Sequence, residues 1–300
     1  MNWQETRDFL EPCFPESIRQ ELELLEPGEL REIRVRAERP TVFVTASRTV
    51  EMSWRPGLHQ LSALAEALSG HSLYARAEET AQGFVTLRGG HRLGLCGRVL
   101  HRKGTNVLSD AGSVCLRIAA EWPGCADALI PRIQQHGRVG SLLIIGTPGS
   151  GKTTLLRDAA RQLATGRSAR QIAVVDERGE LAACVDGVPQ LNVGVSADVL
   201  EGLPKAEAIP WLLRSMAPSV ILTDELAGAE DAAALLDAQA CGAAVCATVH
   251  GASLQDAASR PALAALMSRR VFDLYAVLAA DGSGRIVALH DRSGSPLTAA

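Results

Sequence analysis

The sequence predicts an α/β protein in which a smaller α+β domain precedes a mostly parallel sheet covered by helices. Two observations support this fold class. From Leu142 onward, short apolar runs alternate with helical patterns, which is typical of parallel strands joined by crossover helices. Before Arg132, helical patterns are mixed with strand-like alternation. We therefore expect an α+β domain over residues 1–132 and the sheet domain over 133–300, because 300 residues with 47% hydrophobic content can build two cores.

The N-terminal domain is expected to combine three helices with a group of strands. Apolar residues recur at helical spacing over residues 3–14, 16–25 and 61–70. Strand-like alternation, interrupted by proline or glycine, marks residues 31–46, 83–105 and 113–119. The stretch from Arg76 to Arg117 holds seven basic and three acidic residues, so these strands form a local basic patch.

The second domain is expected to contain six short apolar strands. They cover residues 142–146, 172–176, 220–224, 243–250, 274–280 and 286–291. Residues 121–140 are interpreted as a connecting helix and turn.

A phosphate-binding loop lies between the first of these strands and a helix. The stretch "GTPGSGKT" fits G-x-x-x-x-G-K-[ST] at every fixed position. Its backbone N–H groups and the helix N-terminus are suited to phosphate, with Lys152 on the β- and γ-phosphates and Thr153 on Mg²⁺. The predicted nucleotide-binding residues are Gly146, Thr147, Pro148, Gly149, Ser150, Gly151, Lys152, Thr153 and Thr154. We expect ATP and Mg²⁺ as the ligands.

Acidic residues follow two other strands. Asp224 is predicted to hold Mg²⁺ through water, and Glu225 to act as general base on the attacking water; an N-cap Asp that opens the next helix is the alternative. Asp176 is a further candidate for the metal, and Glu177 and Glu180 are further catalytic candidates; a solvated turn is the alternative for these three.

The strand over residues 243–250 ends in His250. If this strand lies between the phosphate-loop strand and the Asp224 strand, His250 faces the γ-phosphate and can sense it. A structural role is the alternative.

These stretches resemble those of a known family. "RSMAPSVILTDELAGAEDAAALLDAQACGAAVCATVHG" resembles type II and type IV secretion ATPases. "GTPGSGKTTLLRD", "VVDERGELAAC" and "PKAEAIPWLLRSMAP" are similar to segments of the related stage III sporulation protein AA family, over roughly residues 28–280. The resemblance implies a RecA-like motor domain in a hexameric ring that serves membrane-embedded proteins of a channel from mother cell to forespore.

The resemblance also implies residue roles. It makes Lys152 and Thr153 the nucleotide anchors, Asp224 and Glu225 the magnesium and water pair, and His250 the histidine box; Asp176, Glu177 and Glu180 form the acidic box. Secretion ATPases usually have Gly before the glutamate and an Arg shortly after it, whereas this chain has "TDELAG". The arginine that reaches a neighbour's γ-phosphate is therefore open, with candidates Arg88, Arg92, Arg98, Arg117 and Arg214.

Composition sets the compartment and the alternatives. Seven scattered cysteines without a Cys-x-x-Cys pair, a polar N-terminus and no apolar run of roughly 18 residues predict a cytoplasmic protein. The resemblance implies that it is peripheral to a membrane complex. A nucleic-acid-binding module is disfavoured, because Phe84 is the sole aromatic of the basic strands and the net charge is −4. A nucleotide-dependent scaffold with little turnover is the other alternative.

Lysine is rare in the chain, so its positions are informative. Arginine and lysine total 30, of which only Lys103, Lys152 and Lys205 are lysine. Lys205 follows Pro204 at an expected helix start, where the macrodipole opposes a cation. We therefore expect it to meet an anion, either an acidic-box carboxylate or a phosphate across a subunit interface; an exposed lysine without a role is the alternative.

Overall fold

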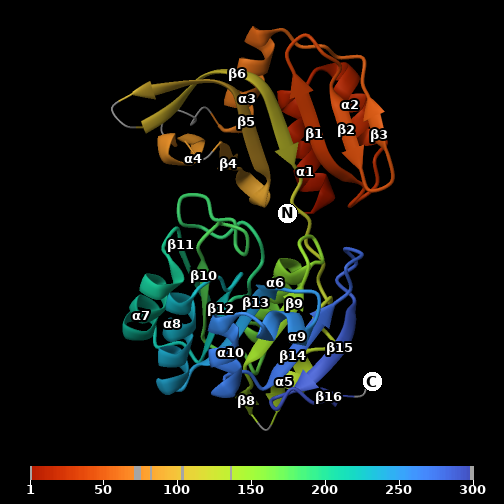
Figure 1. Ribbon diagram of the computed structural model, residues 1–300. Coiled ribbons are helices and arrows are strands. Elements are labelled where there is room, and N and C mark those ends of the chain that lie inside the picture. Colours follow the sequence, from red (N-terminus) through yellow and green to blue (C-terminus); the bar gives the residue numbers. More distant parts are fainter. Residues whose placement is uncertain (1, 71–75, 82, 103–104, 136, 298–300) are drawn as a thin grey trace. The chain divides into compact units, whose positions relative to one another are not determined.

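The computed structural model describes residues 2–70, 76–81, 83–102, 105–135 and 137–297, so Lys103 lies outside the described residues. Within that part the chain forms two compact units (Figure 1). The first unit comprises residues 1–120 and 184–190, and the second comprises 121–183 and 191–300. The division falls before residue 132, because Asp158 on the phosphate-loop helix accepts the backbone N–H groups of Gly124 and Ala126. These bonds tie the connecting segment to the second unit.

The first unit is an α+β domain around an antiparallel sheet. The strand order is β3-β2-β1-β6-β5-β4. Its strands are β1 (Leu30–Arg36), β2 (Val42–Thr45), β3 (Thr49–Glu51), β4 (Phe84–Thr86), β5 (Arg92–Arg102) and β6 (Thr105–Arg117). Its helices are α1 (Trp3–Leu10), η1 (Glu11–Cys13), α2 (Glu16–Glu23), α3 (Leu58–Leu68), α4 (Ala77–Ala81) and η2 (Arg88–Gly90). The three expected helices and the expected strands are therefore present.

One hydrophobic core holds the first unit together. Alternate strand residues such as Ile33, Phe43 and Leu116 are almost fully buried, and so are Leu10 of α1 and Leu61 of α3. Because side chains alternate across a strand, this pattern places one face of the sheet against the helices. Because only one face of the sheet is buried in this core, apolar and polar residues alternate along its strands, and the sequence shows this alternation.

The second unit is built on an eight-stranded sheet. The strand order is β11-β10-β12-β13-β9-β14-β15-β16. All pairs from β11 to β14 are parallel, whereas β15 and β16 are antiparallel additions at one edge. The strands are β9 (Leu142–Gly146), β10 (Ile172–Asp176), β11 (Ala197–Glu201), β12 (Val220–Thr223), β13 (Ala244–His250), β14 (Leu274–Leu278), β15 (Ile286–Asp291) and β16 (Pro296–Leu297). The helices are α5 (Ile130–Ile133), α6 (Lys152–Leu163), α7 (Lys205–Ser215), α8 (Ala229–Ala240), α9 (Leu254–Ala258) and α10 (Pro261–Ser268), and a two-stranded ribbon joins β7 (Gln134–Gln135) to β8 (Arg138–Val139).

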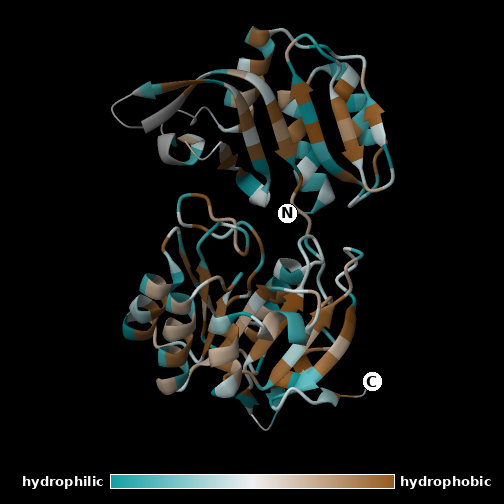
Figure 2. Ribbon diagram, in the orientation of Figure 1, coloured by the Kyte–Doolittle hydropathy of each residue, from teal (hydrophilic) through white to brown (hydrophobic). Residues whose placement is uncertain are grey.

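The central strands are covered on both faces, and every residue of β9, β10 and β12 is buried. Figure 2 shows these strands in brown, whereas the surrounding helices mix apolar and polar residues. Helices α7 to α10 share one apolar cluster with the sheet. Such continuous apolar strands are typical of parallel sheets, so the predicted fold class is confirmed. No helix of the described part is long and apolar enough to cross a bilayer.

Two features of this unit differ from the expectations. β11 was not anticipated, because it is a partly exposed edge strand with the weak apolar pattern "ADVLE". Of the expected connecting helix, only the short α5 forms, since residues 123–129 are turns. The expected position of β13 between β12 and β9 is correct.

Candidate functional site

The phosphate loop leaves β9 and enters α6 at the carboxyl edge of the parallel strands. Parallel strands that share this edge bring the residues after them together, which is where ligands bind in open α/β sheets. Gly149 and Gly151 have φ values of +75° and +97°, which L-residues with side chains rarely adopt. A Cβ on Gly151 would also lie 3.0 Å from the Cα of Gly284. The glycines are therefore required by the backbone path of the loop.

The interior of the loop contains a buried hydroxyl and an ammonium. The side chain of Ser150 is fully buried, and its Oγ has no hydrogen-bond partner among the described residues. A Cβ on Gly146 would collide with that hydroxyl. Lys152 Nζ donates to the carbonyl of Thr147 at 2.9 Å, across the loop. An ammonium and a helix N-terminus thus lie at one loop, a combination that is typical of phosphate sites.

The electrostatic surroundings of Lys152 are mixed. Burial lowers the pKa of its ammonium, and the nearby carboxylates of Asp224 and Glu225 partly oppose this effect. An anion bound in the loop would add to the stabilisation of the charged form.

Asp224 connects three elements of the site. Thr153 Oγ1 of α6 donates to Asp224 Oδ2 at 2.9 Å, and Thr248 Oγ1 of β13 donates to Asp224 Oδ1 at 2.6 Å. The phosphate-loop helix, the end of β12 and the end of β13 are therefore joined through one carboxylate. A hydroxyl and a carboxylate are the oxygen donors that Mg²⁺ prefers in nucleotide sites.

Thr248 was not singled out as a site residue by the sequence reasoning. Its Oγ1 also accepts the backbone N–H of Glu225 at 3.0 Å, so it fixes both acids of the pair. The contact follows from the register of β12 and β13. Thr223 pairs with Ala247, so the next residues, Asp224 and Thr248, lie side by side. A polar residue at this point of a buried strand indicates such a contact.

Glu225 and His250 are both at the same edge. The side chain of Glu225 is 46% exposed, while its backbone is held by Thr248. His250 pairs in register with Gly146, the first residue of the phosphate loop, and is half-buried. Both residues therefore lie at the ends of strands on the edge that carries the phosphate loop, and their predicted roles stay predictions.

Asp176 organises the loop that follows β10. Its Oδ1 accepts the backbone N–H groups of Glu180 and Leu181, and its Oδ2 accepts those of Ala182 and Ala183, at 2.7–3.4 Å. A carboxylate with this many backbone donors is occupied in shaping the chain. For Asp176, expected as a candidate metal ligand, the structure therefore provides a structural role.

Arg157 secures the same loop from the phosphate-loop helix. Its Nε donates to the carbonyl of Leu181 and its Nη2 to that of Glu180, both at 2.6 Å. Arg157 is 8% exposed, and this burial lowers the pKa of its guanidinium. The sequence reasoning missed it, because an arginine in an amphipathic helix is usually a surface residue.

Lys205 contacts the acidic loop directly. Its Nζ lies 2.5 Å from Glu177 Oε2, and its side chain is only 7% exposed. Lys205 is the first residue of α7, preceded by Pro204 as N-cap. The contact with an acidic-box carboxylate confirms the first of the two expectations for Lys205.

We expect Lys205→Arg to lower the free energy of unfolding by about 1–3 kcal/mol, the usual cost of overpacking a buried position. A planar fork cannot occupy the space of a compact ammonium without displacing its neighbours. Urea unfolding measures the effect. Arg214→Lys, at the exposed end of the same helix, is the control and should change stability by less than about 0.5 kcal/mol. A Lys205→Arg protein as stable as the parent would show that the ammonium has no special fit.

The arginine candidates lie in varied surroundings. In the first unit, the Arg92 guanidinium lies 4.0 Å from the centroid of the Phe84 ring, and Arg117 pairs with Glu32 at 3.3 Å. Arg98 is exposed on β5, and Arg214 is exposed at the end of α7 in the second unit. None of these placements by itself assigns a role in catalysis.

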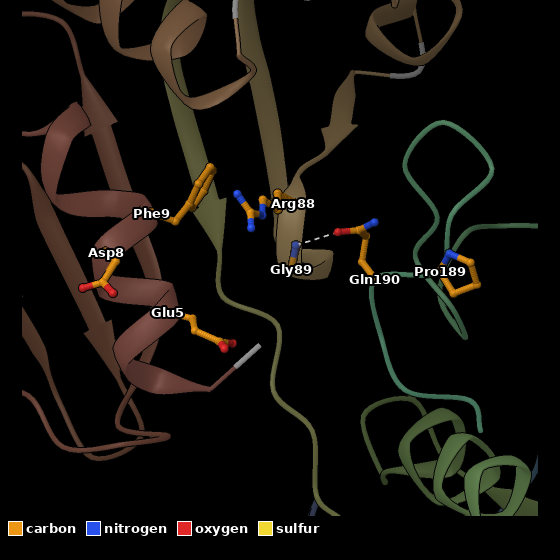
Figure 3. A pocket seen from close by; sticks show the side chains of 7 residues that line it. All are labelled: Glu5, Asp8, Phe9, Arg88, Gly89, Pro189 and Gln190. Atoms are coloured by element: carbon orange, nitrogen blue, oxygen red, sulfur yellow. Dashed lines mark hydrogen bonds between the residues drawn. The ribbon is translucent and has the colours of Figure 1, made fainter. Parts of the chain in front are cut away.

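Arg88 faces a pocket that belongs to the first unit. The pocket has a volume of about 600 Å³ (Figure 3). The segment 184–190, which interrupts the second unit in sequence, contributes to it, since the Gln190 side-chain oxygen accepts the Gly89 N–H at 3.0 Å. It is lined by Glu5, Asp8, Phe9, Arg88, Gly89, Pro189 and Gln190. None of the predicted nucleotide-binding residues lines this pocket.

Solved structures share the fold at low sequence identity. The ATPase DotB of Legionella pneumophila is 19% identical, with a TM-score of 0.57 over 83% of this chain and 72% of that chain. The pilus retraction motor PilT with bound ADP is 18% identical, with a TM-score of 0.59 over 87% of this chain and 76% of that chain. At such identities the likeness establishes the architecture alone.

Sequence comparison identifies the family. Stage III sporulation protein AA of Bacillus subtilis (strain 168) is 39% identical over 275 residues, which cover 90% of this chain and 89% of the relative. The family model described as sporulation stage III, protein AA matches residues 5–297. Because both matches span nearly the whole chain, this protein belongs to the sporulation stage III, protein AA family.

Proposed function

We propose that the chain binds ATP with Mg²⁺ and hydrolyses it at the carboxyl edge of β9, β12 and β13. The hydrogen bond between Thr153 and Asp224 carries this proposal, because it joins the last residue of the phosphate-loop motif to the acid that ends β12. These are the two positions from which P-loop enzymes hold the metal. The structural likeness to a motor solved with ADP supports a nucleotide as the ligand.

The residues of the site have complementary roles in this reaction. Thr153 and Asp224 would hold Mg²⁺, which neutralises charge on the phosphates when it is bound. Lys152 would bind the β- and γ-phosphates, and the backbone of residues 146–154 would surround them. Glu225 would accept the proton of the attacking water, and Thr248 keeps Asp224 and Glu225 in place. His250 would contact the γ-phosphate and report its presence.

Asp176 is assigned to a different task in this scheme. Its four backbone hydrogen bonds define the loop that carries Glu177 and Glu180. We therefore place the metal with Thr153 and Asp224, and the catalytic base with Glu225.

The cellular role that fits best is a motor of a secretion-type apparatus in sporulation. The family gives the sporulation context, and the shared fold gives the relation to secretion and pilus ATPases. In this scheme the chain assembles as a homo-oligomeric ring, with six subunits as our expectation, and acts on membrane-embedded channel proteins between mother cell and forespore.

Turnover should rise more steeply than linearly with protein concentration. A site completed by a neighbouring subunit exists only in the oligomer, so dilution removes activity faster than it removes protein. Phosphate release measured over a concentration series, with particle size measured in parallel, tests this. Strict proportionality in a protein shown to be monomeric would contradict the ring.

Nucleic-acid binding is less consistent with the structure. Phe84, the sole aromatic of the basic strands, has the Arg92 guanidinium over its ring, so that face is not available for a base. Hydrolysis measured with and without single-stranded nucleic acid separates the motor from this alternative. Binding without turnover would instead indicate a scaffold.

A further inference from the structure

We propose that Arg178 is the cation that binds the terminal phosphate of ATP from within the same chain, and that in doing so it releases Glu225. This inference rests on the proposed ATPase function and adds a residue to it. It starts from an ion pair that the sequence reasoning did not anticipate.

Arg178 contacts the predicted general base. Its Nη1 lies 3.2 Å from Glu225 Oε2. The two residues are far apart in sequence but follow neighbouring parallel strands, because Val175 of β10 pairs with Thr223 of β12. The guanidinium is thus placed beside the predicted general base.

Three side chains hold the loop that carries Arg178. Asp176 accepts the N–H groups that follow it, and Arg157 donates to the carbonyls of Glu180 and Leu181. Glu177, the residue before Arg178, is held by Lys205. Since Arg157 belongs to the phosphate-loop helix, the loop that carries Arg178 is positioned against the same helix that would bind the phosphates. Such preorganisation is what electrostatic stabilisation of a reacting phosphate requires.

The ion pair is suited to exchange. The Arg178 side chain is 66% exposed and that of Glu225 is 46% exposed, and exposed ion pairs add little stability. A phosphate offers the planar guanidinium two parallel hydrogen bonds and more negative charge than one carboxylate. An entering γ-phosphate can therefore compete for Arg178, after which the Glu225 carboxylate can accept a water proton.

Three other cations of this unit have described contacts with groups other than Glu225. Arg157 is buried against two carbonyls, and Lys205 is buried against Glu177. Lys152 is placed in the phosphate loop itself. Of these cations, Arg178 is the one whose described contact is with the predicted general base.

The test separates contact with phosphate from contact with Glu225. Arg178→Gln removes the charge, and Glu225→Gln provides a background in which ATP binding is measured without turnover. In that background we expect Arg178→Gln to weaken ATP binding about tenfold or more, the range for a charge-assisted hydrogen bond. ADP binding should change less than about twofold, because ADP lacks the γ-phosphate. With Glu225 present, Arg178→Gln should lower kcat about 10²-fold or more.

Arg292→Gln is the matched control. Arg292 is 54% exposed and lies 3.8 Å from an exposed carboxylate, that of Asp273, in the same unit. This variant should bind ATP and ADP and turn over like the parent. The control measures how much the loss of any exposed, paired arginine of this unit changes binding and turnover.

Two results would overturn the inference. If Arg178→Gln leaves ATP affinity in the Glu225→Gln background unchanged, Arg178 serves only as a partner of Glu225, even if kcat falls. If ATP and ADP affinities fall equally, Arg178 supports the loop and does not recognise the terminal phosphate. Both results leave the proposed ATPase function intact, whereas a parent protein that binds neither nucleotide overturns that function and this inference with it.

Discussion

Replacement of Lys152 by alanine is expected to abolish nucleotide binding. The Nζ atom of Lys152 is held across the phosphate loop by the carbonyl of Thr147, at 2.9 Å. The variant loses this charge together with the hydrogen bonds that it would donate to the phosphates. Equilibrium titration with MgADP and MgATP measures the effect, and we expect affinity to fall by at least about 10²-fold.

The Lys152→Ala protein should stay folded, because the side chain is half-buried and contacts a surface loop. Circular dichroism and a thermal melt without nucleotide are the controls. Parent-like affinity in a folded variant would show that the loop is not the nucleotide site.

Replacement of Glu225 by glutamine is expected to leave binding intact and to lower hydrolysis about 10²- to 10⁴-fold, the usual range for removing a general base. The amide keeps the size of the side chain but cannot accept the water proton. Thr248 holds the backbone of residue 225 and would hold it in the variant too, so the geometry of the site should persist. Phosphate release and nucleotide binding, measured on the same preparation, check both parts.

Glu230→Gln is the matched control for this substitution. Glu230 is an exposed acid in the first turn of α8, close to Glu225 in sequence, and its replacement should leave the rate unchanged. A near-normal rate for Glu225→Gln would move the base to Glu177 or Glu180. Glu177 is the weaker of these two candidates, because Lys205 already holds its carboxylate.

The fold of the second unit could be predicted because its central strands are buried on both faces. Every residue of β9 and β10 is buried, so each strand reads as an uninterrupted apolar run, and the phosphate loop fixes the order of β9 and α6. β11 escaped prediction because an edge strand has one exposed side and carries a weaker pattern.

The site could be predicted only in part, because sequence motifs mark residues that lie next to one another in the chain. The phosphate loop and the pair of Asp224 and Glu225 were found in this way. Arg157 was missed, because its partners are the carbonyls of Glu180 and Leu181, which only the folded loop brings to it. Thr248 and Arg178 were missed for a related reason: their contacts with the acidic pair follow from the neighbour relations among β10, β12 and β13.

The full extent of the first unit could not be predicted from the sequence either. Residues 184–190 leave the second unit in sequence but pack with the first, through the bond between Gln190 and Gly89. Domain boundaries read from composition assume that each domain is one continuous segment. A short excursion of this kind carries no signal in apolar periodicity, so the boundary after residue 132 could not include it.

The central claim is that Thr153, Asp224 and Glu225 form an ATP-hydrolysing site with the phosphate loop. Phosphate release by the purified protein, in Mg²⁺ and in excess chelator, tests it most directly when the Lys152→Ala and Glu225→Gln variants are run beside the parent. The account predicts Mg²⁺-dependent release by the parent only, with MgATP bound by Glu225→Gln and not by Lys152→Ala. Equal release by the parent and both variants, or no binding of MgATP by the parent at any protein concentration, would contradict it.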